Sequence, residues 1–183
     1  MDLTEKTLSN KIIYDGAIIR AELDEVLLPN GSAAKREVVR HPGGVCVAAL
    51  NEKNELAFVT QYRYPYAELV RELPAGKLER GEDPFDALKR ELMEETGASS
   101  DTWRDMGKLY PSPGYCDEII HLYACRIPSH GSSCPDEDEF LEVEYIPLEE
   151  SVRLVMDGQL RDSKTQTLIL KLDNALRKDP DFI

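Results

Sequence analysis

Long apolar segments are missing from this 183-residue chain, although 42% of its residues are hydrophobic. No run approaches the roughly 18 apolar residues that a membrane-spanning helix needs. The N-terminal segment MDLTEKTLSN also lacks the basic and apolar regions of a secretory signal peptide. We therefore expect a cytoplasmic protein with no membrane partner, built around one sizeable core, or one core with a small satellite.

Residues for a cysteine or histidine metal site are scarce. The four cysteines form no CxxC pair, and the chain has only three histidines. A structural zinc site needs such ligands at short, regular spacings. We expect reduced thiols, buried or half-exposed, at Cys46, Cys116, Cys125 and Cys134.

Basic residues are outnumbered, with 22 Lys and Arg against 35 Asp and Glu, and the formal net charge is −13. Nucleic acids and anionic membranes both favour basic surfaces, so neither is the expected partner. An anionic small molecule is compatible with this charge, because a divalent cation and a few arginines can reverse the field locally. Most of the acidic residues are expected to form solvated surface.

The N-terminal part of the chain is expected to form a small antiparallel β domain. Residues 12–28 are rich in Ile, Val and Leu and are expected to form a strand, and residues 29–32 (PNGS) supply a turn. Residues 34–41 are then the returning strand. Because His41-Pro42-Gly43-Gly44 breaks this pairing, we place a domain boundary at residue 43.

The remaining sequence mixes strand and helix patterns, which indicates an α/β sandwich or an α+β fold. Its first two strands flank a turn at residues 51–54 and are expected to form a hairpin. Residues 129–139 are expected to form a polar loop. The strands are predicted at 45–50, 56–62, 69–73, 105–110, 119–125 and 142–146, and the helices at 84–96, 148–157 and 162–177.

The clearest local signal lies in residues 75–98, where a loop runs into a helix. Asp83 fits the helix N-cap, Pro84 the first helical position, and Gly97 the left-handed position that ends the helix. At about 100° per residue, one stripe of this helix is suited to packing and the adjacent face is acidic. The packing stripe comprises Phe85, Leu88, Leu92 and Thr96, and the acidic face comprises Glu91, Glu94 and Glu95.

This acidic face has two interpretations. Placing Glu91 and Glu95 one turn apart costs roughly 0.2 to 0.5 kcal/mol of like-charge repulsion, which a bound dication would reverse. Carboxylates at this spacing, with loop carbonyls and waters, make an all-oxygen site that suits Mg²⁺. An ordinary solvated helix face is the alternative, because such patterns are common in acidic proteins.

The whole segment resembles the Nudix box, G-x5-E-x7-R-E-U-x-E-E-x-G-U, in which U is a bulky aliphatic residue. The matching positions are Gly76, Glu82, Arg90, Glu91, Leu92, Glu94, Glu95 and Gly97. Ala98 stands where a bulkier aliphatic residue is usual, a departure that affects packing and not metal ligation.

The resemblance implies fold class α/β, with a Nudix α/β/α sandwich over residues 44–183 and a small N-terminal antiparallel β domain over residues 1–43. It also implies hydrolysis of a nucleoside diphosphate linked to another moiety, assisted by Mg²⁺ or Mn²⁺.

Residue roles are implied by the same resemblance. Glu91 and Glu95 match direct metal ligands, the Ala75 carbonyl matches a backbone ligand, and Glu94 matches a residue that binds a second metal or orients its waters. Metal ions can neutralise the pyrophosphate and lower the pKa of the attacking water, so these glutamates count as catalytic. The structural residues of the box are Gly76, Glu82, Arg90 and Gly97.

Downstream, residues 112–118 (SPGYCDE) resemble the SPG-x3-E segment of the ADP-ribose pyrophosphatase subgroup. In that subgroup the glutamate lies on a mobile loop and acts as a base toward water, and Glu118 is the matching position. Pro113 and Gly114 are the corresponding substrate-binding residues. Without the box, the same residues would be interpreted as a Pro-Gly turn leading into a strand.

Upstream, residues 61–82 (QYRYPYAELVRELPAGKLERGE) resemble the same subgroup, in which a QxR arginine reaches the substrate's phosphates. Arg63 matches it, whereas Arg71 is a weaker candidate with Glu72 or solvent as its alternative neighbour. Members of the subgroup form dimers in which the N-terminal domains help build the partner's site. Tyr14 is then a candidate for stacking on adenine, with ordinary packing as the alternative, and Arg36 for contact with the terminal ribose or phosphate.

The sequence thus predicts a homodimeric, Mg²⁺-dependent enzyme that hydrolyses ADP-ribose to AMP and ribose 5-phosphate. Another NDP-sugar, such as a GDP-hexose, or a dinucleotide is the alternative substrate. A non-catalytic Nudix module that senses a ligand is the alternative outside catalysis. Such modules usually have an eroded box or an added DNA-binding domain, whereas every box carboxylate is present here.

Overall fold

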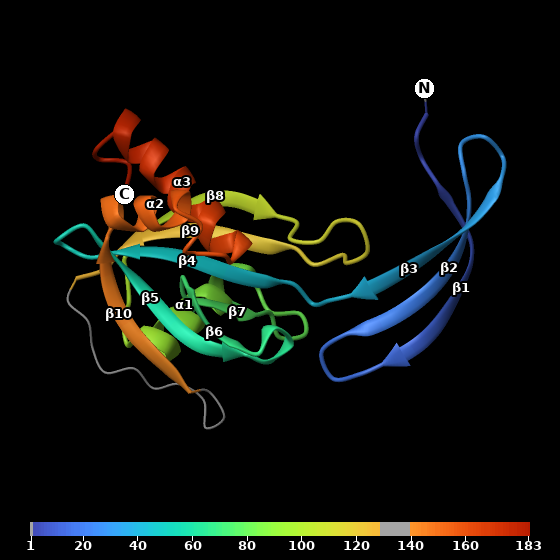
Figure 1. Cartoon of the computed structure of the whole chain (residues 1–183), viewed down its shortest axis with the longest axis horizontal. Coiled ribbons are helices and arrows are strands. Elements are labelled where there is room, and N and C mark those ends of the chain that lie inside the picture. Colours follow the sequence, from blue (N-terminus) through green and yellow to red (C-terminus); the bar gives the residue numbers. More distant parts are fainter. Residues whose placement is uncertain (1, 129–139) are drawn as a thin grey trace. The chain divides into compact units, whose positions relative to one another are not determined.

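The computed structural model describes residues 2–128 and 140–183 (Figure 1). These residues fall into two compact units. One unit comprises the chain up to Gly43 together with Tyr110–Ile119, and the other comprises Gly44–Leu109 and Ile120–Ile183. Cys134 and the polar loop predicted at 129–139 lie outside the described residues.

The N-terminal unit is built on an antiparallel sheet with the strand order β1-β2-β3. The strands are β1 (Lys6–Asp15), β2 (Arg20–Leu27) and β3 (Ala33–Arg40). The predicted turn at residues 29–32 is confirmed, because the Leu28 N–H donates to the Ser32 carbonyl at 2.8 Å and Gly31 has φ +84°. The returning strand agrees with its predicted position to within one residue.

The prediction of one strand from residue 12 to residue 28 is wrong, because the chain reverses between β1 and β2. The Gly16 N–H donates to the Ile19 carbonyl at 3.0 Å and closes this turn. Glycine leaves room there for the Tyr14 ring, since a Cβ at position 16 would lie 2.5 Å from it. The apolar character of the segment hid the turn, and Asp15-Gly16 was its signal.

The second unit is a mixed sheet with helices on both faces. Its main strand order is β10-β5-β4-β9-β8, with β6 beside β5 and β7 beside β4. The strands are β4 (Gly44–Leu50), β5 (Glu55–Arg63), β6 (Glu68–Glu72), β7 (Ala75–Lys77), β8 (Thr102–Leu109), β9 (Ile120–Arg126) and β10 (Leu141–Pro147). The helices are α1 (Pro84–Thr96), α2 (Leu148–Met156) and α3 (Ser163–Lys178), and a short 3-10 helix, η1, spans Tyr64–Tyr66.

Strand β4 shows how the layers are held together, because all its residues are buried and alternate residues face opposite sides. Val45, Val47 and Ala49 pack in one cluster with Leu88 and Leu92 of α1. The intervening Cys46, Ala48 and Leu50 pack in a second cluster with side chains of α2 and α3. Figure 1 shows α1 on one side of the sheet and α2 with α3 on the other, so the expected α/β/α layering is confirmed.

Sequence patterns located the helices and most of the strands of this unit, but β7 lies in a segment predicted as a loop, and β8 begins at Thr102 and not at residue 105. Each helix agrees with its predicted bounds to within one residue. The hairpin predicted from strands 45–50 and 56–62 is only partly correct, since β4 and β5 pair at a single position, Leu50 with Leu56. The two strands then diverge, and in place of each other β4 pairs with β7 and β5 pairs with β6.

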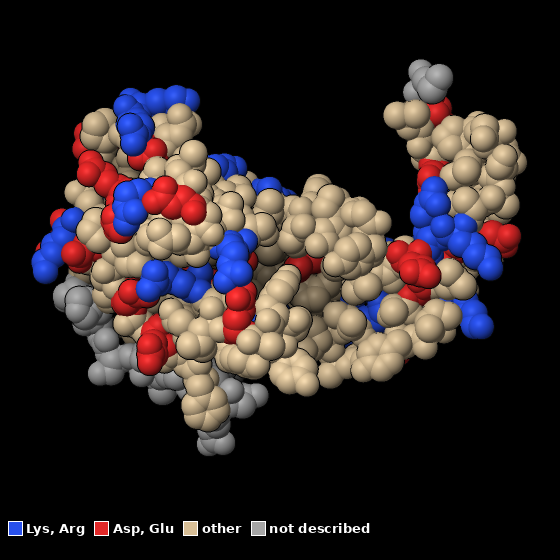
Figure 2. Space-filling model, viewed as in Figure 1, with Lys and Arg blue, Asp and Glu red and all other residues tan. Residues whose placement is uncertain are grey.

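Charged side chains of both signs are interspersed over α2 and α3 on the face shown in Figure 2. Arginines there pair with acids at helical spacing: Arg153 Nη1 lies 2.9 Å from Asp157 Oδ2, and Arg177 Nε lies 2.8 Å from Asp173 Oδ2. Exposed pairs of this kind contribute little to stability. Across the described residues, no helix combines the length and apolar character needed to cross a membrane.

Candidate active site

Helix α1 presents the acidic residues, and its ends are capped as the sequence predicts. The Asp83 carboxylate accepts the Phe85 N–H at 2.8 Å, and Pro84 follows as the first helical residue. At the other end Gly97 has φ +66°, and its N–H donates to the Met93 carbonyl at 2.8 Å. These two caps set the register of the helix, and with it the direction in which each glutamate points.

The packing stripe of α1 anchors the helix to the sheet. Leu88 and Leu92 are fully buried, and the Phe85 ring packs edge-on against Trp103 with 5.5 Å between ring centroids. The Thr96 hydroxyl donates to the Leu92 carbonyl at 2.5 Å. The stripe predicted at these positions is therefore confirmed.

The adjacent acidic face is not an ordinary solvated surface. Glu91 is only 8% exposed and Glu95 only 2%. The Ala75 N–H donates to Glu95 Oε2 at 2.9 Å, and a Cβ at Gly76 would lie 1.8 Å from the Glu91 carboxyl carbon. The Ala75–Gly76 backbone therefore lies directly against both carboxylates, and a side chain at position 76 would displace the Glu91 carboxylate.

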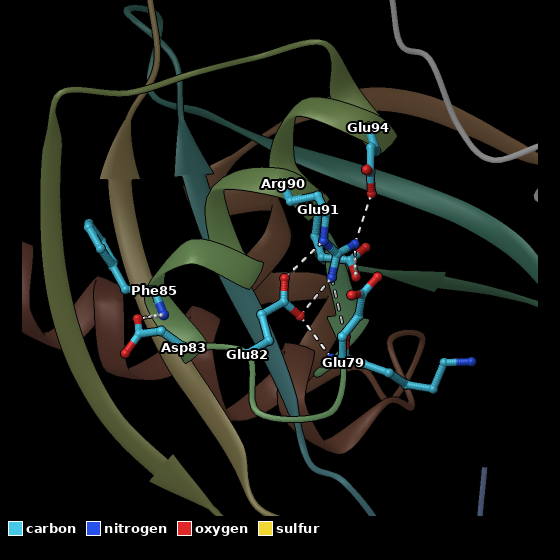
Figure 3. A network of polar contacts seen from close by, with 8 residues as sticks. Glu79, Glu82, Asp83, Phe85, Arg90, Glu91 and Glu94 are labelled. Atoms are coloured by element: carbon cyan, nitrogen blue, oxygen red, sulfur yellow. Dashed lines mark hydrogen bonds and ion pairs between the residues drawn. The ribbon is translucent and has the colours of Figure 1, made fainter. Parts of the chain in front are cut away.

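Arg90 lies among three of the acids, and its guanidinium connects the loop before α1 to the helix (Figure 3). Its Nε donates to Glu82 Oε1 at 3.1 Å, and its Nη1 donates to Glu91 at 2.9 Å and to Glu94 at 3.0 Å. Glu82 also accepts the Glu79 N–H at 2.8 Å. The hydrogen bond to Glu82 raises the pKa of Arg90 and lowers that of Glu82, so both groups stay charged and the loop is held against the helix.

The chemistry of this cluster suits a hard divalent cation. Carboxylate and carbonyl oxygens are the ligands that Mg²⁺ prefers, and Glu91, Glu95 and the Ala75 backbone supply them from adjoining segments. No compact group of three or more metal-ligating His, Cys, Asp or Glu side chains is found among residues 2–128 and 140–183. The suitability of this cluster for Mg²⁺ therefore rests on its oxygen donors and on the close approach of the Gly76 backbone to Glu91.

Glu118 belongs to the N-terminal unit, in a segment that runs along the end of β3. The Val39 N–H donates to the Tyr115 carbonyl at 2.7 Å, and the Asp117 N–H donates to the Val39 carbonyl at 3.0 Å. Asp117 accepts the His41 N–H at 2.8 Å, and Glu118 Oε1 lies 3.4 Å from His41 Nδ1. The segment is thus fixed by main-chain bonds, with the Glu118 carboxylate beside an imidazole.

Pro113 and Gly114 form the exposed turn of this segment. The Cys116 N–H donates to the Ser112 carbonyl at 3.0 Å and closes the turn. The geometry is therefore that of the predicted Pro-Gly turn. Cys46, Cys116 and Cys125 are free thiols, as expected, and burial raises the pKa of Cys125 to about 12.

Arg63 lies at the end of β5 and forms a two-pronged pair with Glu72. Its Nε donates to Oε1 at 2.6 Å and its Nη2 to Oε2 at 2.7 Å. No residue in the described part of the chain accepts a hydrogen bond from Arg63 Nη1, and the side chain is 38% exposed. Arg71 does not face Glu72, its predicted alternative neighbour, but pairs with Glu144 at 2.5 Å.

Tyr14 and Arg36 lie on different strands of the N-terminal sheet. The Tyr14 side chain is exposed, and its ring lies over Gly16. Arg36 is held by Glu5, with Nε 2.9 Å from Oε2 and Nη2 2.5 Å from Oε1. An anionic ligand at Arg36 would have to compete with this carboxylate.

Sequence reasoning assigned no role to Lys164, Asp162 or Thr165, which surround Glu72 and Leu73 from the start of α3. Lys164 contacts both Glu72 and Asp162, and the Thr165 hydroxyl accepts the Leu73 N–H at 2.9 Å. Glu72 and Lys164 are 92 positions apart in the chain, so no local spacing could connect them.

Comparison with known proteins agrees with this arrangement. Residues 39–166 match the family described as the NUDIX domain, so the chain belongs to the Nudix family. Residues 5–39 match the nucleoside diphosphate sugar hydrolase N-terminal domain. The chain is thus a Nudix hydrolase with the N-terminal domain of that group.

The relatives that match nearly the full length include two from Bacillus species. The chain is 41% identical over 177 residues to a methanol dehydrogenase activator from Bacillus methanolicus, covering 94% of this chain and 96% of the relative. It is 40% identical over 179 residues to an ADP-ribose pyrophosphatase from Bacillus subtilis (strain 168), covering 96% and 97%. A solved structure of an ADP compounds hydrolase matches with a TM-score of 0.84 over 100% of both chains at 18% identity, which shows a shared fold.

Proposed function

We propose that this Nudix hydrolase cleaves the pyrophosphate of ADP-ribose, giving AMP and ribose 5-phosphate, with Mg²⁺ as its cofactor and Mn²⁺ as a substitute. The observation that carries the reaction class is the burial of Glu91 and Glu95 against the Ala75–Gly76 backbone. The substrate is supported by the near full-length similarity to a protein named ADP-ribose pyrophosphatase.

In this proposal Glu91, Glu95 and the Ala75 carbonyl hold the divalent cation, and Glu94 binds a second ion or orients its waters. A bound dication would supply charge neutralisation of the pyrophosphate and a lower pKa of the attacking water. Arg90 and Glu82 keep the loop in place, because their ion pair connects the residue before the helix cap to the middle of α1. Gly76 leaves room for the Glu91 carboxylate, and Gly97 provides the left-handed conformation that ends α1.

Arg63 is proposed to bind a substrate phosphate. Glu72 occupies the Nε side of its guanidinium, and Nη1 is then directed to an anionic ligand. The contact fixes the pyrophosphate so that the reacting atoms are oriented before the chemical step.

Glu118 is proposed to be the base. The water oxygen forms a bond to one phosphorus, the bond from that phosphorus to the bridging oxygen breaks, and the carboxylate takes up the water's proton. The main-chain N–H of His41, which donates to Asp117, and the main-chain bonds of Val39 hold the segment that presents Glu118. Pro113 and Gly114 form the turn that is proposed to contact the substrate.

A homodimer is proposed from the surface of the N-terminal sheet, where all ten residues of β1 are exposed. A sheet this small cannot build an adequate core alone, and exposed apolar side chains in contiguous strands indicate a contact surface. A second copy would cover the exposed side chains of Leu8, Ile12, Ile13, Tyr14, Ile18 and Ile19. We assign dimerisation and recognition of the substrate's ends to residues 1–43, with Tyr14 toward adenine and Arg36 toward the terminal ribose, and hydrolysis to residues 44–183.

The free thiols of Cys46 and Cys125 support a reducing compartment, and we propose the cytoplasm. The similarity to a methanol dehydrogenase activator supports a second candidate function, the activation of a methanol dehydrogenase. Stimulation of such an enzyme by the wild-type chain, lost in Glu95→Gln, would support a role that depends on hydrolysis. No stimulation at equimolar protein would remove this candidate.

The substrate is tested by comparing kcat/KM with Mg²⁺ across ADP-ribose, ADP-glucose, GDP-mannose, NADH, diadenosine polyphosphates and nucleoside triphosphates. Because the metal holds the part common to all of them, discrimination must come from the two ends of the molecule. ADP-ribose is expected to give the highest value. A tenfold preference for GDP-mannose or a dinucleotide, about 1.4 kcal/mol in transition-state binding, would overturn the ADP-ribose assignment and leave Nudix hydrolysis standing.

A further inference from the structure

A chain of four charged side chains crosses the interior of the sandwich unit, from α3 to the end of β5. Lys164 is 8% exposed and Glu72 is 2% exposed. The Lys164 ammonium contacts Glu72 Oε2 and lies 3.0 Å from Asp162 Oδ1, and Glu72 in turn holds Arg63. Two cations and two carboxylates thus alternate and cancel.

The placement of Lys164 is unfavourable on local grounds. Burial of an ammonium group carries a large desolvation cost, and well-packed hydrophobic residues are often as stable as a buried ion pair. Lys164 also lies in the first turn of α3, directly after the Ser163 that starts it, where the helix dipole disfavours a positive charge. A residue that breaks two local rules in a buried position points to a role beyond folding.

The side chains of Lys164 and Glu72 both stay charged. Burial disfavours the charged form of Lys164, but Asp162 and Glu72 outweigh it and raise the pKa of the lysine. Burial likewise disfavours the charged form of Glu72, but Arg63 and Lys164 outweigh it and lower the pKa of the glutamate. Glu72 is therefore an anion with cations on two sides.

The contact at Glu72 Oε2 is shared, because this oxygen accepts from both Lys164 Nζ and Arg63 Nη2. Lys164 and Arg63 therefore both restrain this oxygen, while the other carboxylate oxygen accepts from Arg63 Nε. Without the lysine, Arg63 would be the one cation paired with Glu72 among the described residues, and the carboxylate would lose the contact that restrains it from the side of α3.

We propose that Lys164 is a positioning residue for pyrophosphate binding, which acts through Glu72 to keep Nη1 of Arg63 directed at a substrate phosphate. This inference rests on the proposed function in one respect, the contact between Arg63 and phosphate. The neighbouring Thr165 supports the main chain at Leu73 and provides a matched comparison, since it lies on the same turn of α3 but does not contact Glu72 in the hydrogen bonds described.

The test is a double-mutant cycle with Lys164→Met and Arg63→Ala, measured as kcat and KM at saturating Mg²⁺. Lys164→Met alone is expected to lower kcat/KM by about tenfold, mainly through KM, because a ground-state phosphate contact is weakened. In the Arg63→Ala background the same change is expected to cost less than about twofold. Lys164→Arg, which keeps the charge, is expected to restore most of the loss.

An equal loss in both backgrounds would overturn the proposal, because Lys164 would then act on the fold or on the metal loop. Thr165→Val serves as the control, and we expect it to change kcat/KM by the same factor with and without Arg63. The affinity for Mn²⁺ should not change in Lys164→Met. If that variant does not fold, Lys164→Gln, which keeps a hydrogen-bond donor, enters the same cycle with the same two outcomes.

The cycle is measured on whichever substrate of the panel the wild type cleaves best. If Lys164→Met costs less in the Arg63→Ala background on a substrate other than ADP-ribose, this inference stands while the substrate proposal fails. If the cost is the same in both backgrounds on ADP-ribose, this inference alone is rejected.

Discussion

Glu91 and Glu95 are buried to a degree that an acidic helix face would not show without a reason. Arg90 compensates part of their charge, and the Ala75 N–H compensates another part. Gly76 allows the loop to approach α1 closely, because the Glu91 carboxylate occupies the space that a side chain at position 76 would take. At this scale the site depends on single atoms of the loop backbone.

Gly76→Ala tests this close approach. The new methyl group would overlap the Glu91 carboxylate, which lies within 2.2 Å of the Cβ position, so the carboxylate must move away. We expect the Mn²⁺ affinity to fall by about tenfold or more, comparable to the loss of a residue that orients a metal ligand. Titration of Mn²⁺ by electron paramagnetic resonance measures it, and unchanged affinity in the folded variant would show that Glu91 is not a ligand.

Glu118→Gln tests the assignment of the base. A base acts mainly in the transition state, so kcat should fall by a factor of about 10² to 10⁴ while KM changes little. Asp117→Asn is the matched control, because Asp117 is a neighbouring acid that accepts hydrogen bonds from His41 and Arg40. Its kcat should fall less than that of Glu118→Gln. A loss confined to KM would make Glu118 a binding residue and leave one of the box glutamates as the better candidate for the base.

At the scale of elements, helix α1 is the part of the fold that the sequence predicted best. Its caps are local, so Asp83, Pro84 and Gly97 determine the helix bounds without reference to the rest of the chain. The splayed pair β4 and β5 could not be predicted in the same way, because the pairing of β4 with β7 and of β5 with β6 depends on the folded sheet and not on local spacing.

The same distinction holds for the candidate site. The box glutamates are spaced by one helical turn and were predicted from that spacing. The Lys164–Glu72 contact joins two elements that only the folded sheet brings together. Within β1 and β2, the error came from treating a continuous apolar composition as one strand when Gly16 marks a turn.

Asp83→Ala is expected to destabilise the fold by about 1 kcal/mol, since it removes the side-chain acceptor of the Phe85 N–H. Asp86→Ala is the matched control, because Asp86 lies in the first turn of the same helix but caps no N–H in the contacts described. The free energy of unfolding of Asp86→Ala should fall by only about a few tenths of a kcal/mol. Urea unfolding measures both, and equal values would argue against the capping role of Asp83.

At the scale of the whole molecule, the N-terminal sheet exposes the apolar surface on which we base the proposed dimer. Sedimentation at micromolar concentration is expected to give a dimer, because β1 exposes its apolar side chains along its full length. Ile13→Lys should shift the protein toward monomer, whereas Lys11→Glu, on the same exposed strand, should have a smaller effect. A monodisperse wild-type monomer would contradict the dimer and remove the reason for placing Tyr14 near a substrate.

The central claim is that the carboxylates on α1 support metal-dependent cleavage of ADP-ribose at its pyrophosphate. The direct measurement is chromatography of the products formed from ADP-ribose with Mg²⁺ by the wild type and by Glu95→Gln, which removes one charge with little change of shape. The wild type should yield equal amounts of AMP and ribose 5-phosphate, and the folded variant almost none. Near-normal product formation by Glu95→Gln at saturating Mg²⁺ would contradict the account, as would wild-type products other than these two.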